Sequence, residues 1–190
     1  MQHELPQIPL TLGVDIRALR RARGMTLADA AQALGRSVGW LSQVERDRSE
    51  PSISDLRQIA ALFEVPMSIL FRHEAAPAAE AGYIVRAGAR RPIGSSVAGL
   101  VEELLSPDLT DDFEMVHSTF QPHSRIREAV TRPTQEVGYV VSGALEIEID
   151  GTAHSLTAGD SFRIRGEPFR WANRTAVPAV AIWVIAPPVY

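Results

Sequence analysis

Apolar residues follow two different periods along this chain, and the change of period divides it into two parts. Up to about residue 72 they recur at the three- and four-residue spacing of amphipathic helices, whereas beyond about residue 83 they come in short runs typical of strands. The helical part predicts five helices: one at about residues 14–22, two short ones within residues 26–51, one at about residues 53–63, and a short one after Pro66.

Residues 26–51 predict two short helices joined by a tight turn. Thr26 can cap the first of them, and Asp29 three residues later completes a loose capping box. Gly35 follows the apolar stripe at the position where a helix usually ends in a left-handed residue. This segment is therefore predicted to form a helix-turn-helix.

The second of these helices opens at Ser37 and carries two faces of different chemistry. Its buried face is predicted to hold Val38, Leu41 and Val44. The opposite face carries groups that can hydrogen-bond base edges in a major groove, namely Ser37, Gly39, Trp40, Ser42, Gln43 and Arg46. We expect residues 37–43, Val38 included, and Arg46 to contact DNA, with Arg17 and Arg36 on phosphates. For Trp40, contact with DNA is as open as a packing role, in which the ring anchors a dimer or packs on the neighbouring helix.

The segment resembles the phage-repressor-like (XRE) helix-turn-helix family over about residues 12–72. In that family an Arg-x-x-x-Gly-Leu-Thr-Leu start leads through Leu-Ala to Leu-Ser-x-x-Glu-Arg-Gly. The matching positions are Arg20, Gly24, Met25, Thr26, Leu27, Leu41, Ser42, Glu45 and Arg46. The resemblance implies DNA binding, and a structural ion pair between Arg20 and Glu45. Asp47 departs from the family pattern, which ends in Gly.

The second part of the chain predicts a β-sandwich or barrel, because its apolar runs are short and separated by turn signals. Leu145 to Ile149 alternates strictly and is followed by Asp150-Gly151, which is a strong hairpin signal. The predicted strands are residues 84–85, 97–105, 113–120, 137–141, 145–149, 162–164, 169–171 and 180–185.

Two motifs in this part resemble the cupin family over about residues 83–188. One runs from Glu136 to Gly143, and the other begins Ala-Gly-Asp at residues 158–160 and includes Gly166, Pro168 and Asn173. The resemblance implies an α+β chain in which an all-α helix-turn-helix domain precedes an all-β, double-stranded β-helix (jelly-roll) barrel. The predicted divisions are an arm (1–11), a DNA-binding domain (12–72), a linker (73–82) and a cupin domain (83–190).

Metal-dependent cupins hold their ion with two His, a Glu and a further His, which suit iron, manganese or zinc. By alignment to the motifs, Glu136 is in place, but the three His positions fall on Val130, Arg132 and Phe169. We therefore expect no metal and no other cofactor. A triad of His117, His123 and Glu136 is the runner-up.

Without a metal, the barrel interior becomes a candidate cavity for a small effector. Period-two alternation sends Gly138, Val140 and Trp171 inward, and places Arg132 beside Glu136. The predicted effector-binding residues are Arg132, Glu136, Val140, Phe169 and Trp171. We expect an anion on Arg132 and an apolar portion against the aromatic rings. The alternative is that Arg132 and Glu136 neutralise each other in a barrel packed shut.

Charge is distributed unevenly along the chain, with a basic N-terminal part that suits DNA binding and an acidic C-terminal part. The whole chain carries −4, but residues 12–48 hold seven Arg against four acidic residues, and residues 73–190 hold ten Arg against fifteen. A hydrophobic content of 45% excludes global disorder. There is no Cys, no apolar run of about 20 residues and no signal-peptide pattern, so we expect a cytoplasmic protein without a membrane span.

These patterns predict a transcriptional regulator and no enzyme: a homodimer that binds a palindromic operator of double-stranded DNA and responds to a small-molecule effector. Two other classes remain open at this stage. A helix-turn-helix–cupin oxygenase would need a metal, and an antitoxin-like DNA-binding module would need a toxin partner and no effector cavity.

Overall fold

The structure, a computed structural model, describes residues 11–65, 67–70, 80, 82–93, 97–107, 109 and 111–188. It divides into two compact units, one built mainly from residues up to Arg91 and the other mainly from the residues after it. The predicted arm, except for Thr11, and almost all of the predicted linker lie outside the described residues. No helix in the described ranges is long and apolar enough to cross a membrane.

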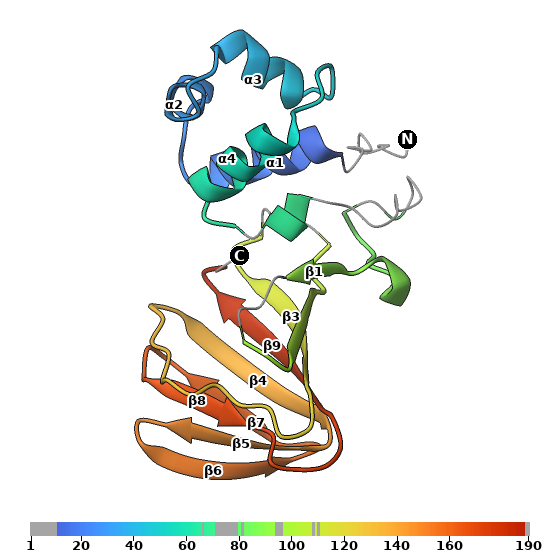
Figure 1. Ribbon diagram of the computed structural model, residues 1–190, viewed down its shortest axis with the longest axis vertical. Coiled ribbons are helices and arrows are strands. Elements are labelled where there is room, and N and C mark those ends of the chain that lie inside the picture. Colours follow the sequence, from blue (N-terminus) through green and yellow to red (C-terminus); the bar gives the residue numbers. More distant parts are fainter. Residues whose placement is uncertain are drawn as a thin grey trace, which may run out of the picture. The chain divides into compact units, whose positions relative to one another are not determined.

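The first unit is helical (Figure 1). Its α-helices are α1 (Leu12–Ala22), α2 (Leu27–Ala33), α3 (Val38–Val44) and α4 (Ile53–Leu62). The predicted fifth helix is wrong, because Met67–Leu70 forms a single 3-10 turn, η1. Four residues are too few to repay the cost of nucleating an α-helix, so the segment adopts the tighter turn while still burying Ile69 and Leu70.

The predicted caps of the helix-turn-helix are present. Thr26 accepts from the backbone N–H of Asp29, and the Asp29 carboxylate accepts from the Thr26 N–H at 2.9 Å, which is a complete capping box. Gly35 has a φ of +62°, the left-handed conformation expected after the end of α2. Ser52 and Asp55 form a second capping box at the start of α4, which the sequence analysis did not identify.

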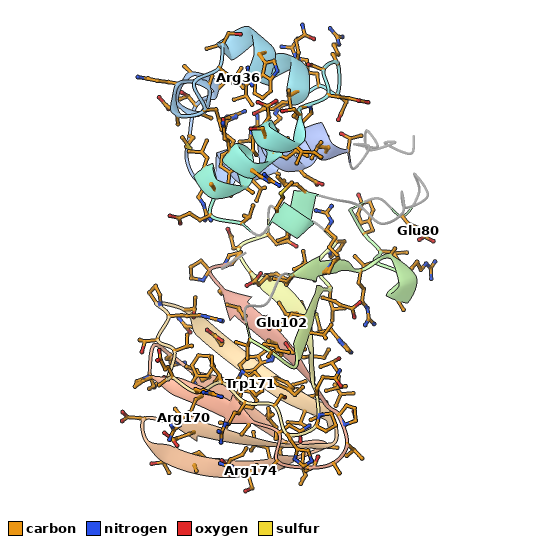
Figure 2. All side chains as sticks on the ribbon, viewed as in Figure 1. Arg36, Glu80, Glu102, Arg170, Trp171 and Arg174 are labelled. Carbon is orange, nitrogen blue, oxygen red and sulfur yellow. The ribbon has the colours of Figure 1, made fainter. Side chains whose placement is uncertain are left out.

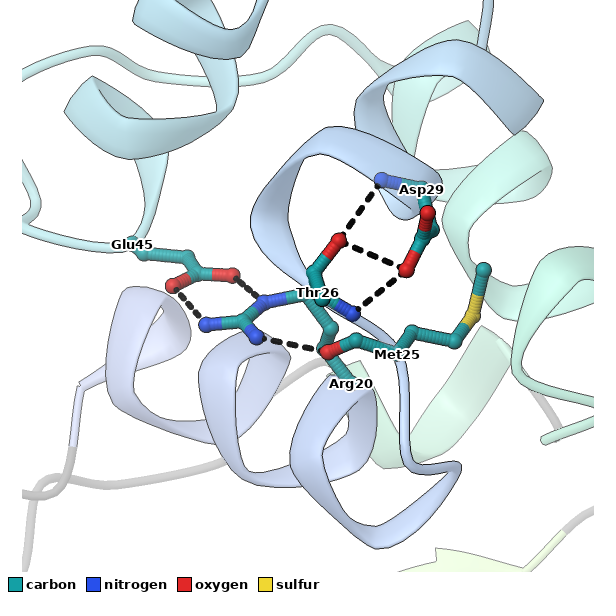
Figure 3. Close-up of polar contacts among 5 residues, drawn as sticks. All are labelled: Arg20, Met25, Thr26, Asp29 and Glu45. Carbon is teal, nitrogen blue, oxygen red and sulfur yellow. Dashed lines mark hydrogen bonds and ion pairs between the residues drawn. The ribbon is translucent and has the colours of Figure 1, made fainter.

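A buried ion pair joins α1 to the end of α3. The Arg20 guanidinium donates to both oxygens of the Glu45 carboxylate, at 2.6 and 2.9 Å, and to the carbonyl oxygen of Met25 at 2.8 Å (Figure 3). The two charged side chains are only 10% and 6% exposed. The structural pair predicted from the family resemblance is therefore present in the structure.

Asp47, the departure from the family pattern, makes a second link between the same elements. It has a φ of +55°, a conformation that usually favours Gly. Its carboxylate accepts from the backbone N–H of Gly13 at 2.9 Å and from the Thr11 hydroxyl. Gly13 must stay small, because an added Cβ would lie 2.3 Å from the Val44 carbonyl oxygen. Asp47 thus helps to satisfy the N-terminal donors of α1.

The second unit is built from two sheets, in which the pairs formed by strands β2 to β9 are antiparallel. One has six strands in the order β1-β2-β3-β9-β4-β7, and the other has three in the order β6-β5-β8. The strands are β1 (Arg91–Ile93), β2 (Leu100–Leu104), β3 (Glu114–Phe120), β4 (Gln135–Ser142), β5 (Ala144–Ile149), β6 (Thr152–Thr157), β7 (Ser161–Ile164), β8 (Phe169–Ala172) and β9 (Ala179–Ala186).

Two features of this unit differ from the sequence-based prediction. The barrel is not closed, because within the described ranges the edge strands β7 and β6 pair only with β4 and β5, respectively, which leaves an open sandwich. Residues 84–85 are not a strand, whereas β1 and β6 are strands that were not predicted. β6 is almost wholly exposed at a sheet edge, so its mostly polar sequence carries no apolar alternation.

The core of this unit lies between the two sheets. It includes Trp171 of β8, which meets Phe120 edge-on at 4.6 Å between ring centroids, and Trp183 of β9, which meets Phe162 at 4.9 Å. Gly138 makes the second contact possible, because a Cβ at that position would lie 2.1 Å from the Phe162 ring. Aromatic side chains therefore fill the sandwich from both sheets.

We expect the Glu45→Gln variant to lose about 3 to 5 kcal/mol of the unfolding free energy of the helical unit, because it leaves the buried Arg20 cation without its carboxylate. Urea unfolding followed by circular dichroism measures this loss. Glu50→Gln, at an exposed carboxylate of the same unit, is the matched control. Equal stability of the two variants would contradict a stabilising role for the pair.

Candidate DNA-binding face and ligand cavity

α3 presents an exposed face that carries the predicted base-reading residues. Ser37 caps the helix and accepts from the Trp40 backbone N–H at 3.1 Å, while Leu41 and Val44 are buried against the helical core. The predicted burial of Val38 is wrong, because its side chain is 46% exposed. It is the first residue of α3, beyond the edge of the core, and therefore joins the face formed by Gly39, Ser42, Gln43 and Arg46.

Arg36 and Trp40 pack against each other within the helical unit. The Arg36 guanidinium donates twice to one Asp55 oxygen, at 2.6 and 3.1 Å, and its centre lies 5.2 Å from the centroid of the Trp40 ring. Hydrogen bonding from Ser52, and further from Arg36, holds the pKa of Asp55 below its usual range despite its burial. Arg36 thereby links the start of α3 to the start of α4, with about half of its side chain still exposed.

The other two predicted arginines lie on exposed positions of the helical unit. Arg17 is exposed on α1, and Arg46 is exposed just beyond the end of α3. The contacts of all these residues with DNA remain predictions, but the arrangement leaves their polar ends available to a nucleic acid.

A cavity of about 220 Å³ lies inside the β-sandwich. Four of the five predicted effector-binding residues line it: Arg132, Glu136, Phe169 and Trp171. Val140 is fully buried but is not among the lining residues. The remaining lining residues were not predicted from sequence to bind an effector: Val97, Leu100, Glu102, Phe120, Ile126, Val130, Trp183 and Ile185.

Glu136 lies on the cavity wall with its carboxylate 1% exposed. Its Oε1 accepts from the Thr134 hydroxyl at 2.7 Å and lies 3.7 Å from a guanidinium nitrogen of Arg132. Its Oε2 is buried and has no hydrogen-bond partner among the described residues. The Arg132 side chain is 40% exposed, and its guanidinium lies 5.9 Å from the centroid of the Phe169 ring. A buried acceptor without a donor is costly, so this oxygen favours a donor supplied from the cavity.

Glu102 of β2 brings a second carboxyl group to the same cavity. It accepts from the Ser118 hydroxyl at 3.1 Å and lies, like Trp171, within the β-unit (Figure 2). Burial raises the pKa of the Glu102 carboxyl, and the nearby Glu136 raises it further, while Ser118 and Arg132 act in the opposite direction. Alternation could have revealed this residue, because Leu100, Glu102 and Leu104 share the inward face of their strand.

The residues of the cavity do not fit a cupin metal. Val130, Arg132 and Phe169 hold the positions of the three His ligands, and none of them offers a ligand atom suited to iron, manganese or zinc. The runner-up triad is not assembled, because His117 lies on the outer face of β3, near Glu103, whereas Glu136 points inward. Within the described ranges, no three His, Asp or Glu side chains are grouped as metal ligands.

Known family models match both units of the chain. A helix-turn-helix domain model matches residues 11–68, and a cupin domain model matches residues 116–185. The chain thus combines an XRE-type helix-turn-helix domain with a C-terminal cupin domain.

Individual proteins resemble this chain over different lengths. The HTH-type transcriptional regulator PuuR of Escherichia coli is 26% identical over 88% of this chain and 90% of its own length. The transcriptional regulator ClgR of Mycobacterium tuberculosis is 28% identical over 50% of this chain and 87% of its own length. A crystal structure of an HTH_3 family transcriptional regulator from Vibrio cholerae aligns over 93% of this chain and 95% of that one, with 24% identity and a TM-score of 0.45.

The raised pKa of Glu102 makes a prediction for the pH dependence of stability. An acid whose pKa is higher in the folded state stabilises the fold below its unfolded pKa, and this contribution is lost as the pH rises through the folded pKa. As the pH rises above about 4, the β-unit of the wild type should therefore lose stability relative to that of Glu102→Gln. Thermal unfolding measured at a series of pH values tests this difference, with Glu128→Gln, at an exposed carboxylate, as control. Parallel pH profiles for wild type and Glu102→Gln would contradict the assignment.

Proposed function

We propose that this protein is a cytoplasmic, homodimeric regulator that reads a palindromic operator with α3 and binds a small effector in the cupin cavity. The observation that carries the proposal is the joint presence of an exposed polar face on α3 and an occupiable cavity in the second unit. The matching helix-turn-helix and cupin domain models, and relatives such as the HTH-type transcriptional regulator PuuR, support a role in transcription regulation.

The chemistry of α3 supports direct reading of bases. The Gln43 amide can pair with an adenine edge, the Ser42 hydroxyl can bond to several base edges, and the exposed Val38 methyls can contact a thymine methyl. Arg17 and Arg46 supply charges for phosphates, which give salt-sensitive affinity. In a homodimer, two such helices would enter major grooves roughly 34 Å apart.

The cavity supports effector binding, because packed protein cores contain few voids larger than a water molecule. At about 220 Å³ it lies below the roughly 300–1,000 Å³ of typical drug-sized sites, so the proposed effector is a small metabolite. The aromatic rings of Phe169 and Trp171 offer contact to its apolar portion. A packed-shut interior, the alternative from sequence, would leave no such volume.

The charges around the cavity bear on the kind of effector. An anion held by Arg132 was the prediction from sequence. Two carboxyl groups, Glu102 and Glu136, share the wall with that single guanidinium, and Arg132 already faces Glu136. These charges favour a ligand that donates hydrogen bonds to Glu136 over one that relies on Arg132 alone.

No enzymatic activity is part of this proposal. The oxygenase alternative needs metal ligands where the chain has Val130, Arg132 and Phe169. An antitoxin-like DNA-binding module needs no effector cavity. A small molecule that binds the cavity and changes the affinity for DNA would therefore support the sensor over this alternative.

DNA binding is tested with operator fragments selected from genomic DNA by the purified protein. Gln43→Ala should weaken operator binding by about tenfold and leave binding to unrelated DNA unchanged, because it removes a base contact. Arg17→Ala should weaken both and lower the slope of log K against log salt by about 1. Arg127→Ala removes one exposed charge from the cupin unit and serves as control. If Gln43→Ala binds the operator as well as this control, α3 is not the reading helix.

Effector binding is tested by thermal shift with small carboxylates, amines and alcohols, followed by calorimetry on the compounds that stabilise the protein. We expect Glu136→Gln to weaken such a ligand by at least about tenfold, and Arg132→Gln to weaken it less, because the unpartnered acceptor is on Glu136. The reverse order would favour the anion prediction. If no compound in a broad metabolite panel stabilised the wild type, the sensing role would be contradicted.

A further inference from the structure

The outer face of the six-stranded sheet is apolar and exposed. Alternation that sends one set of side chains into the core sends another set outward from β2, β3, β4 and β9. Six large apolar side chains on this face are 36–50% exposed: Val101, Met115, Val137, Tyr139, Val141 and Val184. We call them, together with the half-buried Val180 and Ile182, the outer apolar face.

Strand register makes the outer apolar face continuous across three central strands. Val137 of β4 lies opposite Val184 of β9, which lies opposite Met115 of β3. In the next row along the strands, Tyr139 lies opposite Ile182. Directly paired side chains on one face touch their neighbours, so these rows form one patch. Monomeric proteins rarely leave contiguous apolar patches larger than a few hundred Å² in contact with water.

The two edges of this face carry opposite charges. At the β7 edge, Arg163 is exposed and lies opposite Val137. At the β2 edge, Glu103 points outward opposite His117, whose Nδ1 lies 3.7 Å from the Glu103 carboxylate. The outer apolar face therefore has an arginine on β7 at one side and, at the other side, a glutamate on β2 that lies beside His117 of β3.

We propose that a second copy of this chain packs against the outer apolar face, with the twofold axis running along β9. This interface rests on the homodimer proposed above and specifies its surface. A half-turn about an axis parallel to the strands exchanges the two edges, so that the Arg163 edge of one copy lies over the Glu103 edge of the other. The charge pattern thus makes the face complementary to itself.

The size of the face is sufficient for a stable dimer. Strands β2, β3, β4, β7 and β9 are four to eight residues long and about 4.8 Å apart, so together they cover roughly 500 Å² in projection. Accessible area exceeds projected area, so each copy would bury an area near the roughly 800 Å² per partner of a standard interface. Face-to-face packing of two twisted sheets at about 30° is a common geometry and needs no rearrangement of the strands.

The first variant places a charge on the proposed axis. Val184 lies on β9, so Val184→Glu would bring two carboxylates close together across the twofold and should weaken dimerisation by at least about a hundredfold. Val177→Glu makes the same change at a valine that is 56% exposed in the loop before β9, and should leave the dimer intact. Sedimentation equilibrium of the full-length chain measures both, and circular dichroism verifies that the variants are folded.

The second test is a charge exchange between the edges. Arg163→Glu and Glu103→Arg should each weaken the dimer by about threefold to tenfold, and the double variant should return it to within about threefold of the wild type. Within one subunit, Arg163 and Glu103 lie on strands separated by three others, so they are too far apart to compensate for each other. If each residue only stabilised its own subunit, the double variant would therefore not restore the dimer.

The outcomes separate this interface from the function proposed above. If the wild type dimerises and the Val184→Glu variant dimerises equally well, the dimer uses another surface. This result overturns the interface but leaves operator binding by a homodimer standing. Loss of the dimer with Val184→Glu but without rescue by the double exchange overturns the axis along β9. A monomeric wild type overturns both this interface and the proposed homodimer, whatever else covers the outer apolar face.

Discussion

Alternation of side chains across the six-stranded sheet is the constraint on which the cupin unit depends. Each strand has only two faces, so the residues that build the core and those that meet the surroundings are fixed by the same register. On the inward face, β2 and β4 bring Glu102 and Glu136 to the cavity wall. On the outward face, the same strands bring Glu103, Val137 and Tyr139 to the surface. A one-residue slip in β4 would exchange the two functions.

The helical unit is held by polar links that join segments far apart in sequence. Arg20 ties α1 to Glu45, and Arg36 ties the start of α3 to Asp55 of α4. Both links leave the outer side of α3 unoccupied by the rest of this unit. The short helix is therefore supported from behind, so a nucleic acid could approach it without disrupting the core.

Sequence alone predicted most of the regular elements and part of the cavity. Caps and periodicity located the four α-helices, and motif spacing located Glu136 and Arg132. Prediction from sequence failed where the apolar pattern of a segment fits more than one kind of element, or where a segment has no such pattern. η1 has the apolar content of an α-helix but too few residues to form one. β6 is mostly polar because both of its faces are exposed. Glu102 lines the cavity but lies on β2, a strand that carries no cupin motif.

Asp47 shows how a departure from a family pattern becomes part of the structure that surrounds it. The left-handed backbone conformation costs a residue with a side chain about 1 kcal/mol, which Gly avoids. The Asp47 carboxylate offsets that cost by accepting from Gly13 and Thr11 at the first turn of α1. The Gly of the family pattern would relieve the backbone but leave the Gly13 N–H and the Thr11 hydroxyl, at the start of α1, without this acceptor. At this position, the Gly of the family pattern is therefore not a neutral replacement in this chain.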